Sequence, residues 1–320
     1  MQDAAVPPWL KKRLVYDESM NTMKEALSAS GVATVCEESL CPNLNECFSK
    51  KEITFLILGE FCTRSCGFCS VSNSPNLKHT PGVCFKGNMV DPDEPRKVAD
   101  AVDRLSLKYV VITSVTRDDL DDGGAGQFVK VIESVRLVSK HVKIEVLVPD
   151  FKGTKSSIKK IAKASADVFG HNIETVRRLY PIARRGADYD RSLSVLRLVK
   201  ELRQDQITKS SIMVGLGEEE QEVIQTMQNV RSAGCDILTI GQYLRPHKEN
   251  LPVSRLVRPE EFERYVGIGY DFGFKHVSSG PFVRSSYFAQ NIYESVMSLA
   301  STHKQRTLGT IFFIEKIGGY

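Results

Sequence analysis

Long hydrophobic runs are missing from this 320-residue chain. The two longest apolar stretches, residues 53–59 and 237–244, are far shorter than the roughly 18 residues that a membrane span needs. The opening residues, MQDAAVPPWLKKRL, lack the apolar core and cleavage site of a secretory signal and the pattern of a transit peptide. We therefore expect a cytoplasmic location and no membrane partner.

A strong charge of one sign is missing as well. The sequence has 43 Lys and Arg residues against 39 Asp and Glu residues, which gives a net charge of +4. This near balance argues against nucleic acid as the main partner. The hydrophobic content of 42% is sufficient for one large α/β domain or two small ones.

Cysteine is scarce over most of the chain and crowded in one region. Seven of the eight cysteines lie between Cys36 and Cys84, and only Cys235 lies elsewhere. Exported disulfide-rich domains spread their cysteines through the fold, so this crowding favours metal binding in a reducing compartment. We expect Cys235 to be a small buried side chain without a metal.

Strand and helix patterns alternate after residue 52. Short runs rich in Val, Ile, Leu and Thr predict strands, and apolar residues spaced by three and four predict the helices between them. Repeated strand–helix units predict a parallel α/β body, either an open sheet or a barrel. The predicted strands are Ile53–Leu58, Tyr109–Ser114, Lys143–Val148, Asp167–His171, Ser211–Val214 and Ile237–Tyr243, and the predicted helices are Pro95–Leu107, Gly126–Lys140, Thr154–Lys163, Ser192–Gln204, Glu218–Ala233 and Pro259–Gly269.

Polar residues follow several of these strands, where the loops of a parallel α/β fold hold its functional groups. Thr113 and Ser114 end one strand, Asn172 and Glu174 follow another, and the segment GLGE follows a third. None of these loops matches a phosphate-binding or dinucleotide fingerprint. The four aspartates between residues 118 and 122 are more typical of a solvated, glycine-rich turn than of a ligand site.

The strongest local motif is a cysteine triplet directly after the first predicted strand. Cys62, Cys66 and Cys69 form a C-x3-C-x2-C pattern. Three thiolates suit an iron–sulfur cluster, and a four-iron cluster with three protein ligands keeps one iron open. A structural zinc site remains an alternative, with Cys84 or His79 as the fourth ligand.

A second triplet lies upstream of the first. Cys36, Cys41 and Cys47 form a C-x4-C-x5-C pattern, which again is an incomplete ligand set that needs a distant fourth ligand. A zinc-stabilised arm or simple reduced thiols are the alternatives that this spacing leaves open.

The first triplet resembles the signature of the radical S-adenosylmethionine superfamily, C-x3-C-x-aromatic-C, with Phe68 at the aromatic position. The resemblance implies a partial (β/α)6 barrel whose cluster binds S-adenosylmethionine at its open iron. It also implies that Phe68, Thr113, Ser114, Asn172 and Glu174 contact this cofactor. In that superfamily the reduced cluster cleaves the cofactor to a 5′-deoxyadenosyl radical.

The two triplets together resemble the lipoyl synthase family. The similarity runs from PPWLKKRL to RSSYFA and includes CPNLNECF, SVTRDDLDDGGA, GHNIET and GPFVRSSY. It implies a second, auxiliary four-iron cluster on Cys36, Cys41 and Cys47, with Ser286 of the RSSY motif as fourth ligand and Arg284 close by. Ser286 and Arg284 would then be catalytic, and the activity would be insertion of two sulfur atoms at C6 and C8 of a protein-bound octanoyl group.

The resemblance also implies partners and a division of the chain. The partners are octanoylated lipoyl-carrier domains (glycine cleavage H protein and 2-oxoacid dehydrogenase E2), an electron-donor protein and an iron–sulfur carrier protein. We expect an N-terminal arm over residues 1–50, a barrel over 51–283 and a C-terminal arm over 284–320, with both arms packed over the barrel mouth. Two rivals remain: another radical enzyme that inserts sulfur or transfers a methylthio group, and a zinc-stabilised binding module without catalysis.

Overall fold

The computed structural model describes residues 7–12, 18–73 and 90–299. At its centre is an eight-stranded sheet whose strands follow one another in chain order. The first strand pairs antiparallel with the second, and all later neighbours are parallel. The strands are β1 (Ala33–Thr34), β2 (Thr54–Ile57), β3 (Tyr109–Ser114), β4 (Lys143–Leu147), β5 (Val168–Gly170), β6 (Ile207–Val214), β7 (Ile237–Gln242) and β8 (His276–Gly280).

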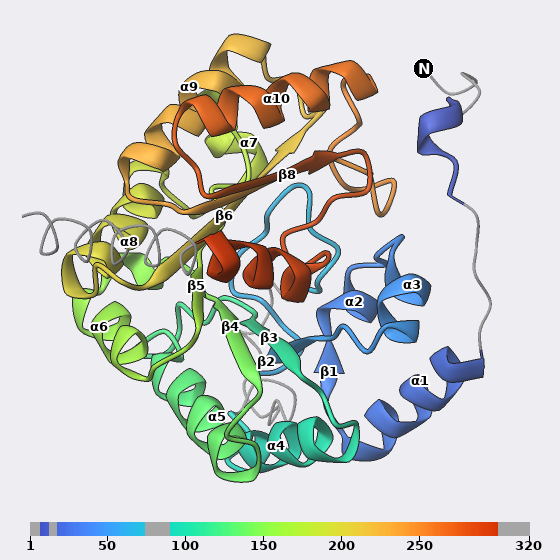
Figure 1. Cartoon of the computed structure of the whole chain (residues 1–320), viewed down its shortest axis with the longest axis vertical. Helices are drawn as coiled ribbons and strands as arrows, with labels where there is room; N and C mark the ends of the chain where they lie inside the picture. Colours follow the sequence, from blue (N-terminus) through green and yellow to red (C-terminus); the bar gives the residue numbers. More distant parts are fainter. Residues whose placement is uncertain (1–6, 13–17, 74–89, 300–320) are drawn as a thin grey trace, which may run out of the picture.

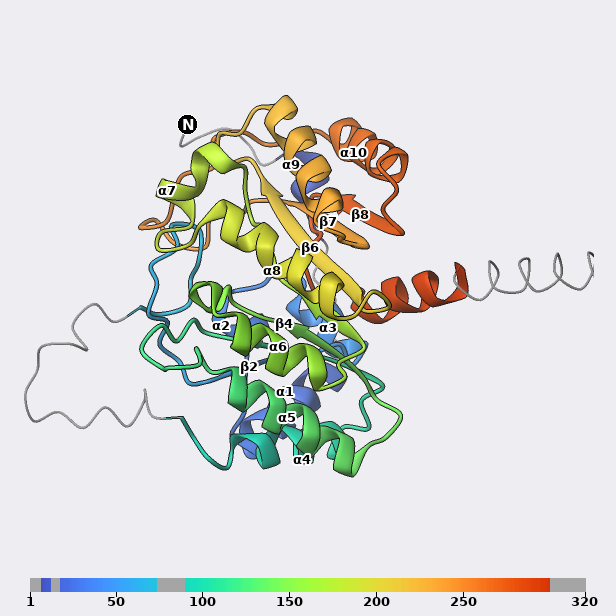
Figure 2. The same ribbon diagram turned by 90° about the vertical axis from the view of Figure 1, so that its left-hand side faces the viewer.

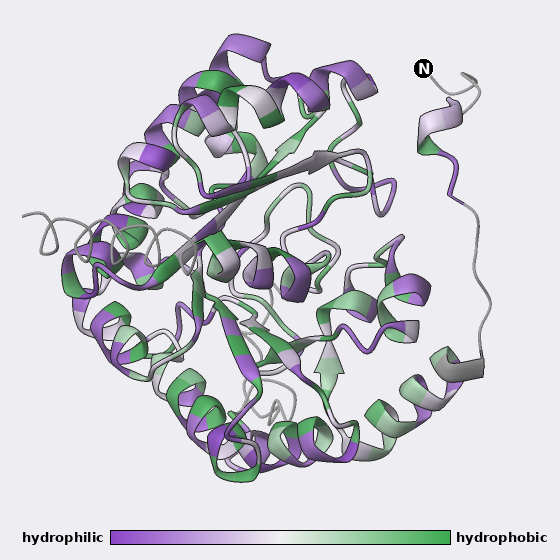
Figure 3. Cartoon of the chain, in the orientation of Figure 1, coloured by the Kyte–Doolittle hydropathy of each residue, from purple (hydrophilic) through white to green (hydrophobic). Residues whose placement is uncertain are grey.

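Helices connect the parallel strands and cover the outside of the curved sheet (Figure 1). Hydrophobic and hydrophilic residues alternate along them in Figure 3, as expected for helices with one buried face. None of the helices in the described ranges is long and apolar enough to cross a bilayer. The connecting helices are α4 (Glu94–Arg104), α5 (Ala125–Val138), α6 (Lys155–Lys163), α7 (Tyr180–Ala183), α8 (Tyr189–Leu202), α9 (Glu220–Ser232) and α10 (Pro259–Asp271), and α1 (Glu18–Ser30), α2 (Val35–Glu38) and α3 (Leu44–Ser49) precede the barrel.

The parallel α/β prediction is confirmed, and each predicted strand and helix is present to within a few residues. Two strands were not predicted. β1 is only two residues long, and β8 consists mostly of small polar residues, so neither carries an apolar strand pattern. The predicted start of β6 at Ser211 is wrong because the strand begins at Ile207.

The early part of β6 escaped prediction because it contains three successive polar residues, of which Lys209 points into the barrel. Lys209 has a side chain that is only 2% exposed, and its ammonium group pairs with the Glu145 carboxylate on β4 at 2.9 Å. The Tyr109 hydroxyl on β3 donates to the same carboxylate at 2.7 Å. The charges of Lys209 and Glu145 are therefore paired, as their burial requires.

The C-terminal arm differs from expectation in where it lies. Residues 289–299 form a helix whose residues Ala289, Ile292, Tyr293 and Val296 pack against the first residues of several strands. Figure 2 shows this red helix at the end of the sheet opposite the loop that follows β2. The expectation that the whole arm covers the mouth is thus wrong for this helix, whose apolar face closes the other end. The last twenty-one residues, 300–320, lie outside the described residues.

Candidate radical and auxiliary cluster site

The loops at the C-terminal ends of the strands surround a cavity of about 290 Å³. All three cysteines of the downstream triplet line it. Its walls also include apolar side chains from β2, β4 and β6, among them Leu56, Leu147 and Met213. The mouth of this barrel therefore combines candidate metal ligands with an apolar lining.

The downstream triplet lies on a loop that the barrel grips from both sides. The backbone N–H of Gly67 donates to the carbonyl of Ala183 in α7 at 2.9 Å, and the carbonyl of Gly67 accepts from the N–H of Leu251 at 2.8 Å. A Cβ on Gly67 would lie 2.9 Å from the Ile182 carbonyl oxygen, so only glycine fits here. The loop is thereby wedged between two neighbouring segments.

Backbone amides also point at the first sulfur of this triplet. The N–H groups of Arg64 and Thr116 both donate to the Cys62 sulfur, each at 3.4 Å. Such donors stabilise negative charge on a thiolate. These two donors would offset part of the negative charge on the sulfur if Cys62 bound a metal.

A buried ion network anchors the same loop. Arg64 bonds to Asp118 at 2.7 Å and to Asp150 at 2.7 Å, and Arg191 of α8 bonds to the other oxygen of Asp150 at 2.8 Å. The Asp150 side chain is 0% exposed. Asp118 is thus part of a structural network, and Asp119 pairs with Arg117, so neither behaves as a free metal-binding carboxylate.

Burial makes the thiols of two downstream cysteines hard to ionise. Burial raises the pKa of Cys66 to about 11 and that of Cys69 to about 12, and neighbouring thiols add to both increases. A bound metal would be needed to keep them as thiolates. Across the described ranges, no three Cys, His, Asp or Glu side chains converge on one point closely enough to hold a single metal ion. The ligands of a cluster bind separate irons and need no such convergence.

Zinc as a single-ion alternative would have used Cys84 or His79. Both residues lie outside the described residues. The three cysteines of the loop do not themselves form a single-ion site in the part of the chain described here.

The five residues expected to contact S-adenosylmethionine all line the same cavity: Phe68, Thr113, Ser114, Asn172 and Glu174. The Ser114 hydroxyl and the Asn172 side-chain oxygen are buried and have no hydrogen-bond partner among the described residues. Unpaired buried polar atoms are rare, so these two fit the polar groups of a bound cofactor. The Thr113 hydroxyl instead donates to the Leu147 carbonyl at 2.9 Å.

Glu174 is held in place by its neighbours. The Asn172 amide donates to the Glu174 carboxylate at 3.0 Å. The backbone of Glu174 has a φ of +67°, a conformation that is strained for a residue other than glycine. Burial raises the pKa of Glu174, and the charge of Arg184 partly opposes that shift. A cationic group on a bound ligand would further stabilise the ionised Glu174 carboxylate.

Arg184 is a site residue that the sequence pattern did not reveal. It lines the mouth cavity, its guanidinium bonds to the hydroxyls of Tyr180 and Ser192, and its charge acts on Cys66 and Glu174. Its bonds to Tyr180 of α7 and Ser192 of α8 hold it there. A basic residue at the end of a short helix gives no such signal in sequence.

The upstream triplet lies beside the barrel on the helices before β2. Cys36 is in α2, Cys47 is in α3, and Cys41 lies between them, with its N–H bonded to the Cys36 carbonyl at 3.1 Å. Burial raises the pKa of Cys36 to about 11 and raises that of Cys47 as well. As at the first site, metal would be needed to keep these thiols ionised.

Ser286 reaches this second site from the other end of the chain. It lines a small cavity together with Cys36 and Cys47, and it also lines the mouth cavity that holds the downstream cysteines. Arg284 lines the mouth cavity too, and burial lowers its pKa while the charge of Cys41 opposes that shift. The structure thus brings the expected ligand Ser286 and the expected neighbour Arg284 to the side of the upstream cysteines that faces the barrel mouth.

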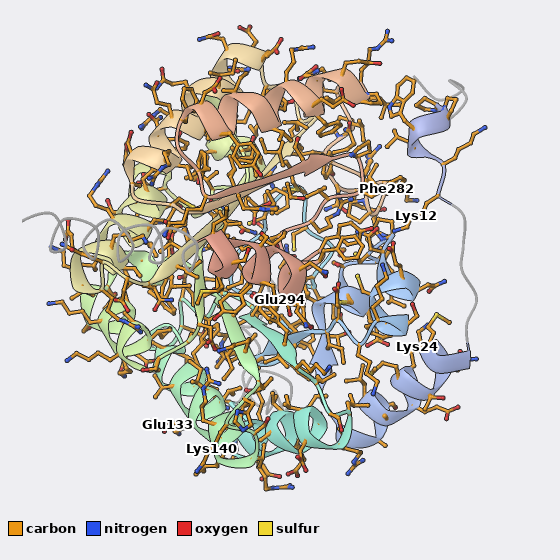
Figure 4. All side chains as sticks on the ribbon, in the orientation of Figure 1. Lys12, Lys24, Glu133, Lys140, Phe282 and Glu294 are labelled. Atoms are coloured by element: carbon orange, nitrogen blue, oxygen red, sulfur yellow. The ribbon has the colours of Figure 1, made fainter. Side chains whose placement is uncertain are left out.

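Several contacts hold the C-terminal arm in this position. The Asn43 amide donates to the Phe282 carbonyl at 2.7 Å, and the Tyr287 hydroxyl donates to Glu46 at 3.0 Å. Lys12 pairs with Glu46 at 2.7 Å and lies 5.5 Å from the centre of the Phe282 ring; Figure 4 labels both Lys12 and Phe282. Residues from three distant parts of the chain therefore meet around the upstream triplet.

Comparison with known proteins agrees with this arrangement. The family model of the Radical SAM superfamily matches residues 56–230, from β2 to α9. The X-ray structure of the FeFe-hydrogenase maturase HydG from Carboxydothermus hydrogenoformans covers 88% of this chain and 78% of that chain with a TM-score of 0.53 and 13% identity, which supports the fold. The chain is a radical S-adenosylmethionine protein.

Full-length relatives narrow this class further. The lipoyl synthase of Caldicellulosiruptor bescii is 51% identical over 89% of this chain and 94% of that protein. The lipoyl synthase of Rubrobacter xylanophilus is 49% identical over 88% of this chain and 85% of that protein. The chain belongs to the lipoyl synthase family, as the two cysteine motifs predict.

Proposed function

We propose that the two cysteine groups divide the work of lipoyl synthesis between a radical site and a sulfur site. Within its family the chain is a radical sulfurtransferase that inserts two sulfur atoms at C6 and C8 of a protein-bound octanoyl group, and it uses two [4Fe–4S] clusters and S-adenosylmethionine. The observation that carries the proposed division is that Ser286 lines the cavities of both cysteine groups. A substrate in the mouth would therefore lie between the two sites.

At the radical site, Cys62, Cys66 and Cys69 would hold the cluster that supplies the electron for cleaving S-adenosylmethionine to a 5′-deoxyadenosyl radical. The buried Ser114 hydroxyl, which has no partner among the described residues, would donate or accept a hydrogen bond, and the buried Asn172 side-chain oxygen would accept one. Glu174 would bind a cationic group, while Phe68 and Thr113 would pack beside the cofactor. These residues orient the cofactor and exclude water, which is the contribution a protein makes to radical chemistry.

At the sulfur site, Cys36, Cys41, Cys47 and Ser286 would hold the auxiliary cluster. An alkoxide oxygen is a hard ligand in a soft-ligand site, so the Ser286 bond should be the most labile of the four. Arg284 would place a positive charge beside this cluster, on the side of Cys41. The cluster supplies the sulfur atoms, and these side chains hold it next to the mouth.

The mouth cavity suits an acyl chain attached to a carrier protein. Its apolar side chains, including Leu56, Val115 and Leu147, would hold the octanoyl group, while the carrier domain stays outside. We propose the H protein of glycine cleavage and the E2 subunits of 2-oxoacid dehydrogenases as carriers, with an electron donor and an iron–sulfur carrier as further protein partners. We also propose a cytoplasmic location.

The barrel of this enzyme is proposed to be the six-unit partial barrel of its superfamily. Strands β2 to β7 with their helices would form it, and β8 would extend its edge. The N-terminal arm (1–50) and the C-terminal arm (284–320) would supply the auxiliary site. The lining of one small cavity by Cys36, Cys47 and Ser286 supports this part of the proposal.

Two cysteine variants test the division of work. Cys66→Ala should abolish both cleavage of S-adenosylmethionine and product formation, whereas Cys36→Ala should still cleave the cofactor but insert no sulfur. Each variant should keep about four irons of the roughly eight expected for two clusters. The measurements are 5′-deoxyadenosine and lipoyl product by mass spectrometry on an octanoyl-lysyl peptide, with iron and sulfide analysis. Equal loss of cofactor cleavage in both variants would contradict the proposal.

A further inference from the structure

Glu52 brings a carboxylate to the auxiliary site. It lies two residues before β2, and its backbone N–H donates to the carbonyl of Cys47 at 2.9 Å. Its side chain lines the small cavity that Cys36, Cys47 and Ser286 also line. The cavity therefore contains a second candidate oxygen ligand besides the serine.

The two oxygens of this carboxylate are not equally satisfied. The backbone N–H of Phe288, two residues after Ser286, donates to the Glu52 carboxylate. The oxygen Oε2 is buried and has no hydrogen-bond partner among the described residues. A buried carboxylate oxygen without a partner is costly, so a cation beside it would stabilise the folded protein.

The two lysines whose charges act on Glu52 already have carboxylate partners of their own. The positive charges that act on it come from Lys50 and Lys209, but Lys209 is paired with Glu145 and Lys50 with Glu46. Glu46 adds a negative charge. The chemical class that fits the remaining oxygen is a metal cation that accepts hard oxygen ligands, and iron accepts carboxylates.

We propose that Glu52 is a reserve ligand for the fourth iron of the auxiliary cluster, which takes this iron when its bond to Ser286 breaks. The proposal rests on the proposed function of the upstream cysteines and Ser286. In this exchange the bond between iron and the serine oxygen breaks, a water molecule gives a proton to the serine oxygen and leaves as hydroxide, and a bond between iron and the Glu52 carboxylate forms. The oxidation state of the iron does not change.

A purely structural role is the competing interpretation. Glu52 could serve only to tie the segment before β2 to the C-terminal arm through Phe288. Glu52→Gln separates the two roles, because its amide oxygen can still accept from the Phe288 N–H while the anionic ligand is lost. Gln290→Ala is a matched control, since Gln290 lines the same cavity but bonds to Glu294 at 2.8 Å.

The experiment isolates the auxiliary cluster in a chain whose Cys62, Cys66 and Cys69 are all replaced by alanine. Ser286→Ala, Glu52→Gln, the double variant and Gln290→Ala are reconstituted anaerobically in this background. Iron, sulfide, electron paramagnetic resonance after mild oxidation and the rate of ferrous iron capture by a chelator are measured. Circular dichroism checks that each variant folds.

We expect Ser286→Ala to keep about four irons and the double variant to keep about three, with the resonance of a three-iron cluster. Capture of the fourth iron should be roughly tenfold or more faster in the double variant than in Ser286→Ala. Equal iron content, spectra and capture rates in these two variants would overturn the role of Glu52. Absence of any cluster in the parent background would instead overturn the proposed function of the upstream triplet.

Discussion

The two cysteine sites differ in how the chain builds them. The downstream triplet lies within a single loop after β2, and the fixed parts of the barrel grip that loop on both sides. The upstream triplet depends on the ends of the chain, because its helices precede the barrel and Ser286 follows the last strand. One site is local in sequence, and the other is assembled from distant segments.

The contacts that stabilise the two sites differ in burial as well. The downstream loop is anchored by Arg64 and Asp150, with side chains that are 6% and 0% exposed. The link between the chain ends at the upstream site uses Lys12 and Glu46, which are each 24% exposed. Partly exposed contacts open at lower cost than buried networks, so the upstream site is the easier one to open. That difference suits the proposed role of the upstream cysteines in holding the cluster that donates sulfur.

The largest predicted effect breaks the anchor of the downstream loop. Arg64→Ala leaves the buried Asp150 carboxylate with only Arg191 as a charged partner, so the free energy of unfolding should fall by about 3–5 kcal/mol. The radical-site cluster should be lost, while about four irons remain on the upstream cysteines. Urea unfolding and iron analysis measure the two effects.

An exposed ion pair provides the control for this prediction. Arg177 pairs with Asp190 on the surface, with side chains that are 58% and 66% exposed, so Arg177→Ala should cost less than about 1 kcal/mol. Loss of both clusters from Arg64→Ala would show that the two sites are not independent. The downstream and upstream sites would then not be stabilised separately, as the comparison between them assumes.

The next effect concerns the crossing between β7 and Val283, the residue just before the C-terminal arm. A Cβ on Gly241 would lie 2.0 Å from the Val283 carbonyl oxygen, so Gly241→Ala must push the arm away, at a cost of about 1–3 kcal/mol. Because Ser286 lies three residues after Val283, iron should be released faster from the auxiliary cluster than in the wild type, with little change at the radical cluster. A chelator assay on the reconstituted protein measures both rates.

Gly267→Ala is the matched control for that substitution. Gly267 lies in α10, and no atom lies within 4 Å of the position that an alanine methyl group would occupy there. Alanine at this position should therefore stabilise the helix by up to about 1 kcal/mol. Equal iron release from the two glycine variants would mean that the position of the arm does not control the auxiliary cluster.

Sequence patterns predicted the strands and helices in which buried positions carry apolar residues and exposed positions carry polar ones. The six apolar strands and their helices follow the expected periodicities, and the downstream triplet is local, so both could be found without a structure. The first half of β6 could not, because Lys209 is a charged residue inside the barrel whose partner Glu145 lies on another strand. A prediction from hydrophobic periodicity treats a charged residue such as Lys209 as exposed.

The site shows the same limit. Tertiary packing brings three charged residues to the sites: Arg184, Glu52 and Arg64. A single basic or acidic residue in a sequence does not indicate that it will lie in a site. Ser286 was found only through the resemblance of RSSY to a known motif, since from composition it would pass as a surface turn. Long-range assembly is therefore what sequence reasoning without a family could not supply.

The smallest predicted effect removes one hydrogen bond from the link between the chain ends. Tyr287→Phe keeps the ring but loses the bond to Glu46, which should cost about 1 kcal/mol at pH 7, while the exposed Tyr270→Phe should cost nothing measurable. Burial opposes ionisation of Glu46, but Lys12, Lys50 and Tyr287 outweigh it and lower its pKa from 4.5 to about 2. The stabilisation from this lowered pKa is present above pH 4.5 and is lost as the pH falls towards 2, so the cost of Tyr287→Phe should shrink over that range. Urea unfolding of both variants at several pH values measures it, and a cost that stays constant below about pH 4 would show that the ionised Glu46 is not the partner that matters.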